Sequence, residues 1–280
     1  MTARILIARK ELSILLVNYK TPRLTSLCLS LLYKKFDLSL VDIIVVDNDS
    51  ADESVSYLRS LNWIQLIERR VTATEKCHVA HAQALDLGIQ HIYSEFVLII
   101  HTDTFIYNSK IVDIMLRLIR EHKDVACVGT NHQRFRKMHK RVWRTLKKVT
   151  SYYCQGLSYL LGFSDTAPVA FVDRYLKSFC CLWDVDIIKN FGLRFCAEDR
   201  NPGYTMQDQL AGLKFNKVII SAKLIFQHLS HVQSGSNAEI GVYNKDHRRA
   251  IAFNQLVELH TVKSGAEQEP TLRSEEKFTA

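Results

Sequence analysis

The chain has 280 residues, 47% of them hydrophobic and 24% charged, which is the composition of a globular protein with a sizeable apolar core. Ten Gly and four Pro are too few for a collagen-like or low-complexity chain. The net charge of +8 favours a phosphate-bearing partner such as a nucleotide, a nucleic acid or an anionic lipid.

The first half of the chain alternates short apolar runs with helical patterns. The predicted strands are Leu12–Asn18, Asp42–Val46, Trp63–Glu68 and Phe96–Ile100. Four helices are predicted between and after these strands. The first begins at Thr21-Pro22, and the second follows the polar turn Asp47–Asp52. The third spans Val79–Ile92, and the fourth runs from Asn108 to Glu121. Strands that alternate with helices predict βαβ units and a mainly parallel sheet.

The second half is less regular. We expect a late strand over Val218–Phe226, a helix over Asn244–His260 and a disordered polar tail over residues 263–280. No Pro/Gly/Ser-rich linker divides the chain, so one domain over residues 12–262 is predicted, after an N-terminal extension of residues 1–11. Residues 12–124 of this domain carry the regular pattern and residues 125–262 the looser one.

Apolar runs such as Phe96–Ile100 are far too short to span a bilayer, so no transmembrane helix is expected, and no signal peptide is evident. The seven Cys lack metal-site spacing and indicate buried thiols in a reducing compartment. The sequence therefore predicts a cytoplasmic protein.

Polar side chains follow three of the predicted strands. They are Asn18-Tyr19, Asp47-Asn48 and His101-Thr102-Asp103. Ligands of open parallel sheets bind beyond the carboxyl ends of the strands, so these groups are expected at one binding edge. Each alone is a helix cap or a turn; their coincidence at one edge indicates a site.

No GxGxxG follows the first strand, and no GxxxxGK[ST] occurs anywhere in the chain. A dinucleotide-binding domain and a P-loop enzyme are therefore not indicated. A Mg or Mn ion held by carboxylate is the expected means of neutralising a diphosphate.

Four segments resemble the inverting GT-A glycosyltransferases of family 2. They are SILLVNYKT, IIVVDNDSADES, HAQALDLGI and FVLIIHTDTFI, and the second follows that family's VVDNxSxDxS pattern closely. The resemblance covers roughly residues 12–231 and implies a GT-A, Rossmann-like fold: a mainly parallel sheet flanked by helices, with a C-terminal acceptor-side region. It implies that residues 12–124 form the nucleotide-sugar-binding half and residues 125–262 the acceptor-side half. The chain departs from the family at His101, where the first Asp of the DxD motif is usual, and at Asp86, where Asn is usual.

The resemblance also implies roles for individual residues at the donor site. Tyr19 would stack on the base and Asp47 would hydrogen-bond it, while Asp103 would bind the metal. The complete set implied to contact the nucleotide-sugar is Asn18, Tyr19, Asp47, Asn48, Thr102 and Asp103.

Downstream, MQDQLAGLKF is similar to the family's Glu-Asp-x-Asp-Leu stretch, which makes Asp208 the expected catalytic base and puts Gln207 where Glu is usual. FQHLSHVQSGS resembles the segment that supplies a late metal-binding His. His228 is preferred there over His231. The reaction implied is a single displacement by an acceptor hydroxyl.

Residues 132–153 form a basic segment with a helical apolar stripe. Between His132 and Lys148 there are eight Lys and Arg, and no acidic residue occurs between Asp124 and Asp165. Three interpretations stay open: a core-facing helix with a solvated basic face, an interfacial helix on an anionic inner leaflet, and a docking site for an acidic acceptor.

These observations predict a metal-dependent glycosyltransferase of surface polysaccharide synthesis. Its expected partners are a UDP- or dTDP-sugar donor, a glycan or lipid-linked acceptor, and an anionic membrane surface on which it is peripheral. The substitutions at His101 and Gln207 also fit an alternative, a non-catalytic nucleotide-sugar-binding partner protein. A nucleic-acid ligand is not expected, because no zinc-finger, RRM or helix-turn-helix signature accompanies the charge.

Overall fold

A computed structural model describes residues 9–72, 75–133, 138–163, 165, 175–197 and 200–232 of the chain. The helix expected over residues 244–260 and the tail expected over residues 263–280 lie outside the described residues, as do the first eight residues of the N-terminal extension.

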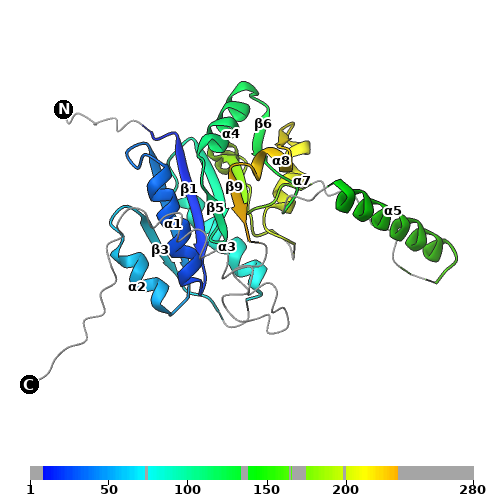
Figure 1. Cartoon of the computed structure of the whole chain (residues 1–280), viewed down its shortest axis with the longest axis horizontal. Coiled ribbons are helices and arrows are strands. Elements are labelled where there is room, and N and C mark those ends of the chain that lie inside the picture. Colours follow the sequence, from blue (N-terminus) through cyan, green and yellow to red (C-terminus); the bar gives the residue numbers. More distant parts are fainter. Residues whose placement is uncertain are drawn as a thin grey trace, which may run out of the picture.

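A seven-stranded sheet crosses the molecule in the order β3-β2-β1-β4-β7-β6-β8 (Figure 1). These strands span Leu12–Asn18 (β1), Val41–Asn48 (β2), Gln65–Arg69 (β3), Phe96–His101 (β4), Val125–Gly129 (β6), Cys180–Asp184 (β7) and Asn216–Ile219 (β8). Strands β3, β2, β1 and β4 are mutually parallel, and β7 runs antiparallel between β4 and β6. Two short strands, Thr104–Ile106 (β5) and Leu229–His231 (β9), form a separate antiparallel pair.

Helices cover both faces of the sheet, which gives the mixed α/β architecture predicted from the sequence. The helices of the described residues, of which α5 lies apart from the sheet, span Pro22–Lys35 (α1), Glu53–Ser60 (α2), Cys77–Gln90 (α3), Lys110–Glu121 (α4), Met138–Leu160 (α5), Val185–Asn190 (α6), Tyr204–Gly212 (α7) and Ala222–Ile225 (α8). None of the helices in the described part of the chain combines the length and the apolar character needed to cross a bilayer.

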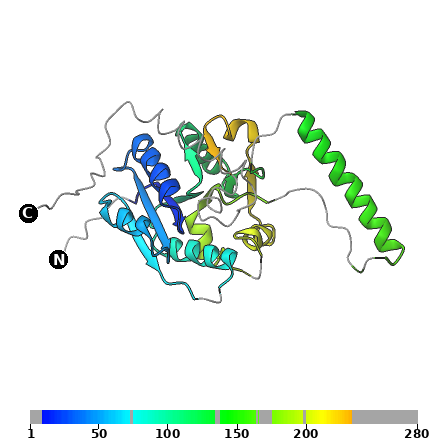
Figure 2. The same cartoon turned by 60° about the horizontal axis from the view of Figure 1, so that its bottom comes forward.

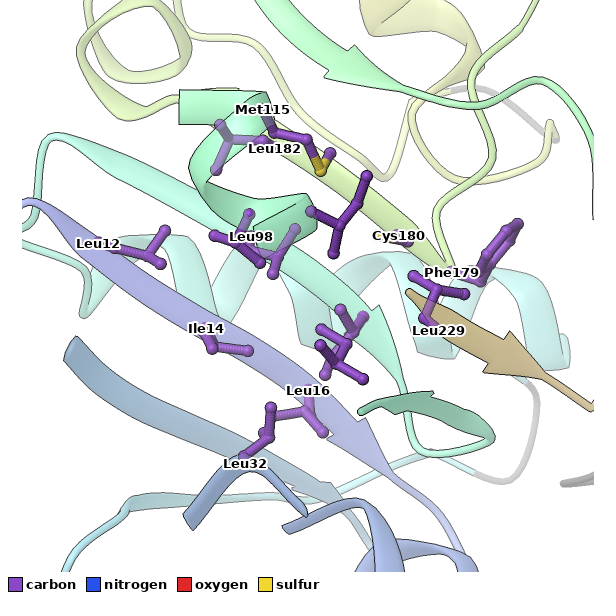
Figure 3. Close-up of a cluster of buried hydrophobic side chains, with 14 of the residues drawn as sticks. Leu12, Ile14, Leu16, Leu32, Leu98, Met115, Phe179, Cys180, Leu182 and Leu229 are labelled. Carbon is purple, nitrogen blue, oxygen red and sulfur yellow. The ribbon is translucent and has the colours of Figure 1, made fainter. Parts of the chain in front are cut away.

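The alternation of side chains along β1 builds two separate cores. Leu12, Ile14 and Leu16 point to one face, where they pack with α1, α2 and α4 (Figure 3). Leu15 and Val17 point to the other face, which α3, α6 and α7 cover. A strand that is buried on both faces must be apolar throughout, which is why the continuous run LSILLV predicts it correctly.

The four strands predicted in the first half correspond to β1, β2, β3 and β4, whereas the predicted late strand does not agree with the structure. The predicted strand Val218–Phe226 is wrong, because β8 ends at Ile219 and the helix α8 follows it. The Ser221 hydroxyl accepts the backbone N–H of Leu224 at 3.3 Å and so caps the new helix. Strands β5, β6, β7 and β9 were not predicted.

Thr21 occupies the N-cap position of α1, but its side chain does not cap the helix as expected. Its hydroxyl instead donates to the Asn18 side chain at 3.1 Å. Pro22 stands at the first helical position, as predicted.

All seven cysteines are free thiols. Cys28, Cys127, Cys180 and Cys181 are buried as expected, whereas Cys77 and Cys154 are exposed. Burial raises the pKa of the Cys180 thiol to about 12, so this side chain stays uncharged in the core.

Gly88 lets α3 lie directly against β1. A Cβ at this position would meet the side chain of Leu15 at 2.5 Å, and Leu15 is fully buried. The close packing of helix on strand below the binding edge therefore requires a residue without a side chain.

We expect Gly88→Ala to lower the free energy of unfolding by about 1–3 kcal/mol, because the added methyl group overpacks the core. Gly212→Ala is the matched control, since Gly212 also lies in a helix and a Cβ there meets nothing within 4 Å. Urea unfolding measures both variants. An equal gain in stability for the two would contradict the packing argument.

Candidate functional site

A buried amide joins the ends of β1 and β2. The Asn18 Nδ2 atom lies 2.7 Å from Asp47 Oδ1 and 2.8 Å from Ser54 Oγ, while Asn18 Oδ1 accepts the Thr25 hydroxyl at 2.7 Å. Further contacts reach Ser50 and Thr21. The fold thus brings together Asn18 and Asp47, which were predicted separately as ligand contacts. Asn18 is fully buried, and only 3% of Asp47 is exposed to solvent.

The turn after β2 is folded around the Asp47 carboxylate. Ser50 donates to it twice, from its hydroxyl at 2.6 Å and from its backbone N–H at 3.1 Å. Asp49 and Ala51 have φ of 63° and 50°, and this left-handed backbone turns the chain back toward Asp47. Asp52 then caps α2 by accepting the Ser54 N–H at 2.9 Å. The Asp47 carboxylate therefore holds the turn between β2 and α2 in place.

Tyr19 and Asn48 differ in accessibility. Tyr19, directly after β1, is 41% exposed, whereas Asn48 is buried at the end of β2. The Asn48 Oδ1 atom accepts from Arg69 at 2.8 Å. Arg69 also forms a largely buried ion pair with Glu75 at 2.6 Å and contacts Gln83, so its guanidinium is held in one orientation.

Asp103 lies at the turn between β4 and β5 and is 3% exposed. The Nδ1 atom of His231 lies 3.3 Å from Asp103 Oδ1. The backbone N–H of Val232 donates to the Asp103 carbonyl at 2.9 Å, which fixes β9 beside the carboxylate. The sequence preferred His228 as the partner of Asp103, but the pairing of β5 with β9 brings His231 to it. His228 instead accepts backbone N–H groups from Tyr107 and Asn108 through its carbonyl.

His101 and His81 complete an imidazole cluster around Asp103. His101 Nδ1 is 3.9 Å from Asp103 Oδ1, and its Nε2 is 3.0 Å from the Ser178 hydroxyl. The His81 ring meets the His101 ring edge to face at 5.1 Å. Burial lowers the pKa of His101 to about 3 and that of His81 to about 4, so both rings are neutral at physiological pH. Thr102, between His101 and Asp103 in the sequence, is buried, and its hydroxyl oxygen lies 3.4 Å from that of Thr21.

The donor atoms around Asp103 fit a metal ion whose remaining coordination positions are filled by a bound ligand. Over the described residues, no three His, Cys, Asp or Glu side chains are grouped so as to hold a metal by themselves. A Mg or Mn ion bound with a nucleotide takes one or two protein ligands and its other ligands from phosphate and water. The Asp103 carboxylate and the His231 imidazole suit that arrangement.

Asp208 belongs to a second polar group, on α7. Both of its carboxylate oxygens lie within 2.9 Å of the Tyr175 hydroxyl, and Arg200 donates to Oδ2 at 2.9 Å. Tyr175 stacks on Tyr204 at 4.2 Å. The helix α7 begins at Tyr204, and Asp208 lies one turn further on.

Two substitutions relative to the family pattern have structural explanations. The Gln207 amide accepts the N–H of Leu176 at 2.8 Å and donates to its carbonyl at 3.1 Å, a pairing that a carboxylate cannot make in full. The Asp86 carboxylate accepts the N–H groups of Phe195 at 2.7 Å and Cys196 at 3.0 Å. Burial raises the Asp86 pKa, and these two donors oppose that rise.

Sequence reasoning missed Arg69, His81, Tyr175 and Arg200 as members of these groups. Arg69 ends the strand β3, so the strand-end rule that selected Asn18 and Asp47 could have found it. The other three carry no such signal, because they come from a helix interior and from loops.

A sequence model of the family described as "Glycosyl transferase family 2" matches residues 13–174, more than half of the chain. No curated protein matches the sequence.

Solved structures share the fold at low sequence identity. The mannosyltransferase PcManGT from Pyrobaculum calidifontis, in complex with GDP-Man and Mn2+, is 14% identical with a TM-score of 0.52. That match covers 76% of this chain but only 55% of the archaeal chain. S. aureus TarS 1-349 is 17% identical with a TM-score of 0.51, covering 94% of this chain and 76% of that one. These similarities support the GT-A architecture.

We expect Asn18→Ala to lower the free energy of unfolding by about 2–4 kcal/mol, because it leaves several buried polar groups unpaired. Asn190→Ala, at an exposed position on α6, is the control and should change stability little. Thermal and urea unfolding of both variants test this. Unchanged stability together with lost nucleotide binding would instead make Asn18 a ligand contact.

Proposed function

This chain belongs to glycosyl transferase family 2, and we propose that it transfers a sugar from a UDP- or dTDP-sugar to a hydroxyl of a glycan or lipid-linked acceptor. The proposal includes inversion at the anomeric carbon and a role in surface polysaccharide synthesis. The observation that carries it is the buried Asp103 carboxylate beside His231, at the sheet edge where β1 and β2 also end.

We assign the nucleotide to the ends of β1 and β2. The exposed ring of Tyr19 offers a face on which a base can stack. Asp47 Oδ2 accepts the Ser50 N–H and retains further acceptor capacity, which suits a base N–H. Asn48, oriented by Arg69, is the neighbouring amide.

Asp103 and His231 are the proposed protein ligands of a Mg or Mn ion, with Thr102 beside them. Support comes from the fit of one carboxylate and one imidazole to a metal that diphosphate oxygens complete. The Pyrobaculum protein, whose complex contains GDP-Man and Mn2+, has the same fold. When bound, such an ion neutralises the negative charge that develops on the departing diphosphate.

Asp208 is the proposed general base, which takes the proton of the acceptor hydroxyl as that oxygen attacks the anomeric carbon. Its carboxylate is 36% exposed and therefore accessible to an acceptor, while Tyr175 and Arg200 fix its orientation. To act as base, Asp208 must accept the acceptor hydroxyl in addition to, or in place of, one of these donors.

We expect Asp103→Asn to abolish Mn-dependent strengthening of UDP or dTDP binding, because the amide cannot supply the negative charge that the metal needs. Asp113→Asn, on the exposed face of α4, is a control with the same chemical change. Calorimetric titration of nucleotide with and without Mn distinguishes the two. If nucleotide binding by the Asp103→Asn variant still depends on the metal, the assignment of Asp103 as a metal ligand is wrong.

We expect Asp208→Asn to reduce the transfer rate about 10²–10⁴-fold while the affinity for the donor stays close to that of the parent. Arg200→Gln removes the ion pair but keeps the carboxylate, so it should reduce the rate far less. Single-turnover transfer and nucleotide titration measure the two quantities. Equal rate losses in both variants would indicate that Asp208 acts only through its ion pair with Arg200, and its assignment as the general base would be wrong. Binding without turnover in the parent would favour the non-catalytic alternative.

A further inference from the structure

Helix α5 lies apart from the sheet and its covering helices. Its 23 residues extend about 34 Å at 1.5 Å per residue, and both views place it clear of the rest of the described chain (Figures 1 and 2). A helix that packs on no neighbour normally has a polar surface all round. The side chains of α5 do not follow that rule.

One side of α5 is an exposed apolar stripe. Its members, spaced 4, 3, 4, 4 and 3 residues apart, are Val142, Leu146, Val149, Tyr153, Leu157 and Leu160. All but Val149 are between 52% and 81% exposed. Because residues 3 and 4 apart lie on one side of a helix, these side chains form one continuous strip. The interpretation of this segment as a core-facing helix is therefore wrong for the described chain.

Positive charge and aromatic rings accompany the stripe. Outside the stripe, α5 carries the basic residues Lys140, Arg141, Arg144, Lys147 and Lys148. The segment between Asp124 and Asp165 has no acidic residue to neutralise them. Trp143 and Tyr152 fall along the two borders of the stripe, and Trp143 is 63% exposed. Aromatic rings at such borders are typical of residues that lie at the level of lipid headgroups.

We propose that α5 lies in the plane of an anionic bilayer surface, with the apolar stripe inserted among the acyl chains and the Lys and Arg residues among the phosphates. An apolar sector, aromatic borders and a basic polar face together are the features of an interfacial helix. A second copy of the chain fits less well, because its α5 carries the same charge and a symmetric pairing would oppose like charges. An acidic glycan would account for the charge but not for the exposed leucines.

This inference rests on α5 alone and not on the proposed donor site. It adds to the proposed transfer a surface that would keep the enzyme beside a lipid-linked acceptor. Nucleotide binding in solution, without vesicles, tests the donor site separately, so the two proposals can fail independently.

The test is sedimentation of the full chain with vesicles of phosphatidylcholine mixed with phosphatidylglycerol, and with vesicles of phosphatidylcholine alone. We expect binding to the anionic vesicles, weaker binding as salt is raised, and a blue shift of Trp143 fluorescence that Trp143→Phe removes. Leu157→Glu should lower the vesicle partition coefficient at least about tenfold, since it removes one inserted leucine.

Gln155→Glu is the matched control, because it adds the same charge two residues away on the polar side of α5. It should weaken binding much less than Leu157→Glu does. Circular dichroism and nucleotide titration confirm that both variants stay folded. Equal losses in the two variants, or no binding of the parent to either vesicle, would overturn the proposal. So would an oligomer that forms without vesicles and dissociates in Leu157→Glu, because the stripe would then be an interface between copies.

Discussion

The side chain of Asn18 determines how the binding edge is built, because a buried amide must find hydrogen-bond partners where it ends a strand. Its two polar atoms reach the carboxylate of Asp47 on one side and the hydroxyls of Thr21 and Thr25 on the other. Through Ser54 it also reaches the beginning of α2. Two strands and two helix beginnings are therefore set by one residue. The same hydrogen bonds fix the position of the turn that follows Asp47 and Asn48.

The opposite part of the edge has a different chemistry. There the carboxylate of Asp103 is surrounded by imidazole rings, and Phe179 stacks on His231 at 4.1 Å. Burial keeps the His101 ring neutral, so this ring orients the carboxylate without cancelling its charge, whereas a lysine or an arginine would cancel it. The Asp47 carboxylate is satisfied by hydroxyl and amide donors, whereas the Asp103 carboxylate keeps an environment suited to a cation. The two carboxylates thus have different surroundings, although each stands next to the end of a parallel strand.

The first half of the fold could be predicted because its strands are buried on both faces and its turns have clear polar signals. Leu12–Asn18 agrees with the prediction to the residue. Strand β7 could not be found, because Cys180–Asp184 is short, has no alternation, and pairs antiparallel with strands distant in sequence. The choice between His228 and His231 depended on the register that pairs Thr104 with His231, which local sequence does not encode. The burial of Gln207 against Leu176 likewise depends on contacts across 31 residues. The candidate residues Asn18, Asp47 and Asp103 were thus found at strand ends and Asp208 through the family resemblance, whereas partners such as Arg69, His81, Tyr175 and Arg200 were not found.

The antiparallel placement of β7 has a consequence for how such an enzyme can diversify. The chain leaves the sheet at Thr130 and returns at Lys177, whose backbone N–H donates to the Thr130 carbonyl at 2.8 Å. Helix α5, Met138–Leu160, lies between those two residues and away from Tyr175 and Leu176, which contact α7. Insertions or deletions in α5 need not disturb strand register, because the closing hydrogen bond is independent of the length of that helix. Helix α5 can therefore be exchanged as a module while the sheet that carries Asn18 and Asp47 keeps its register.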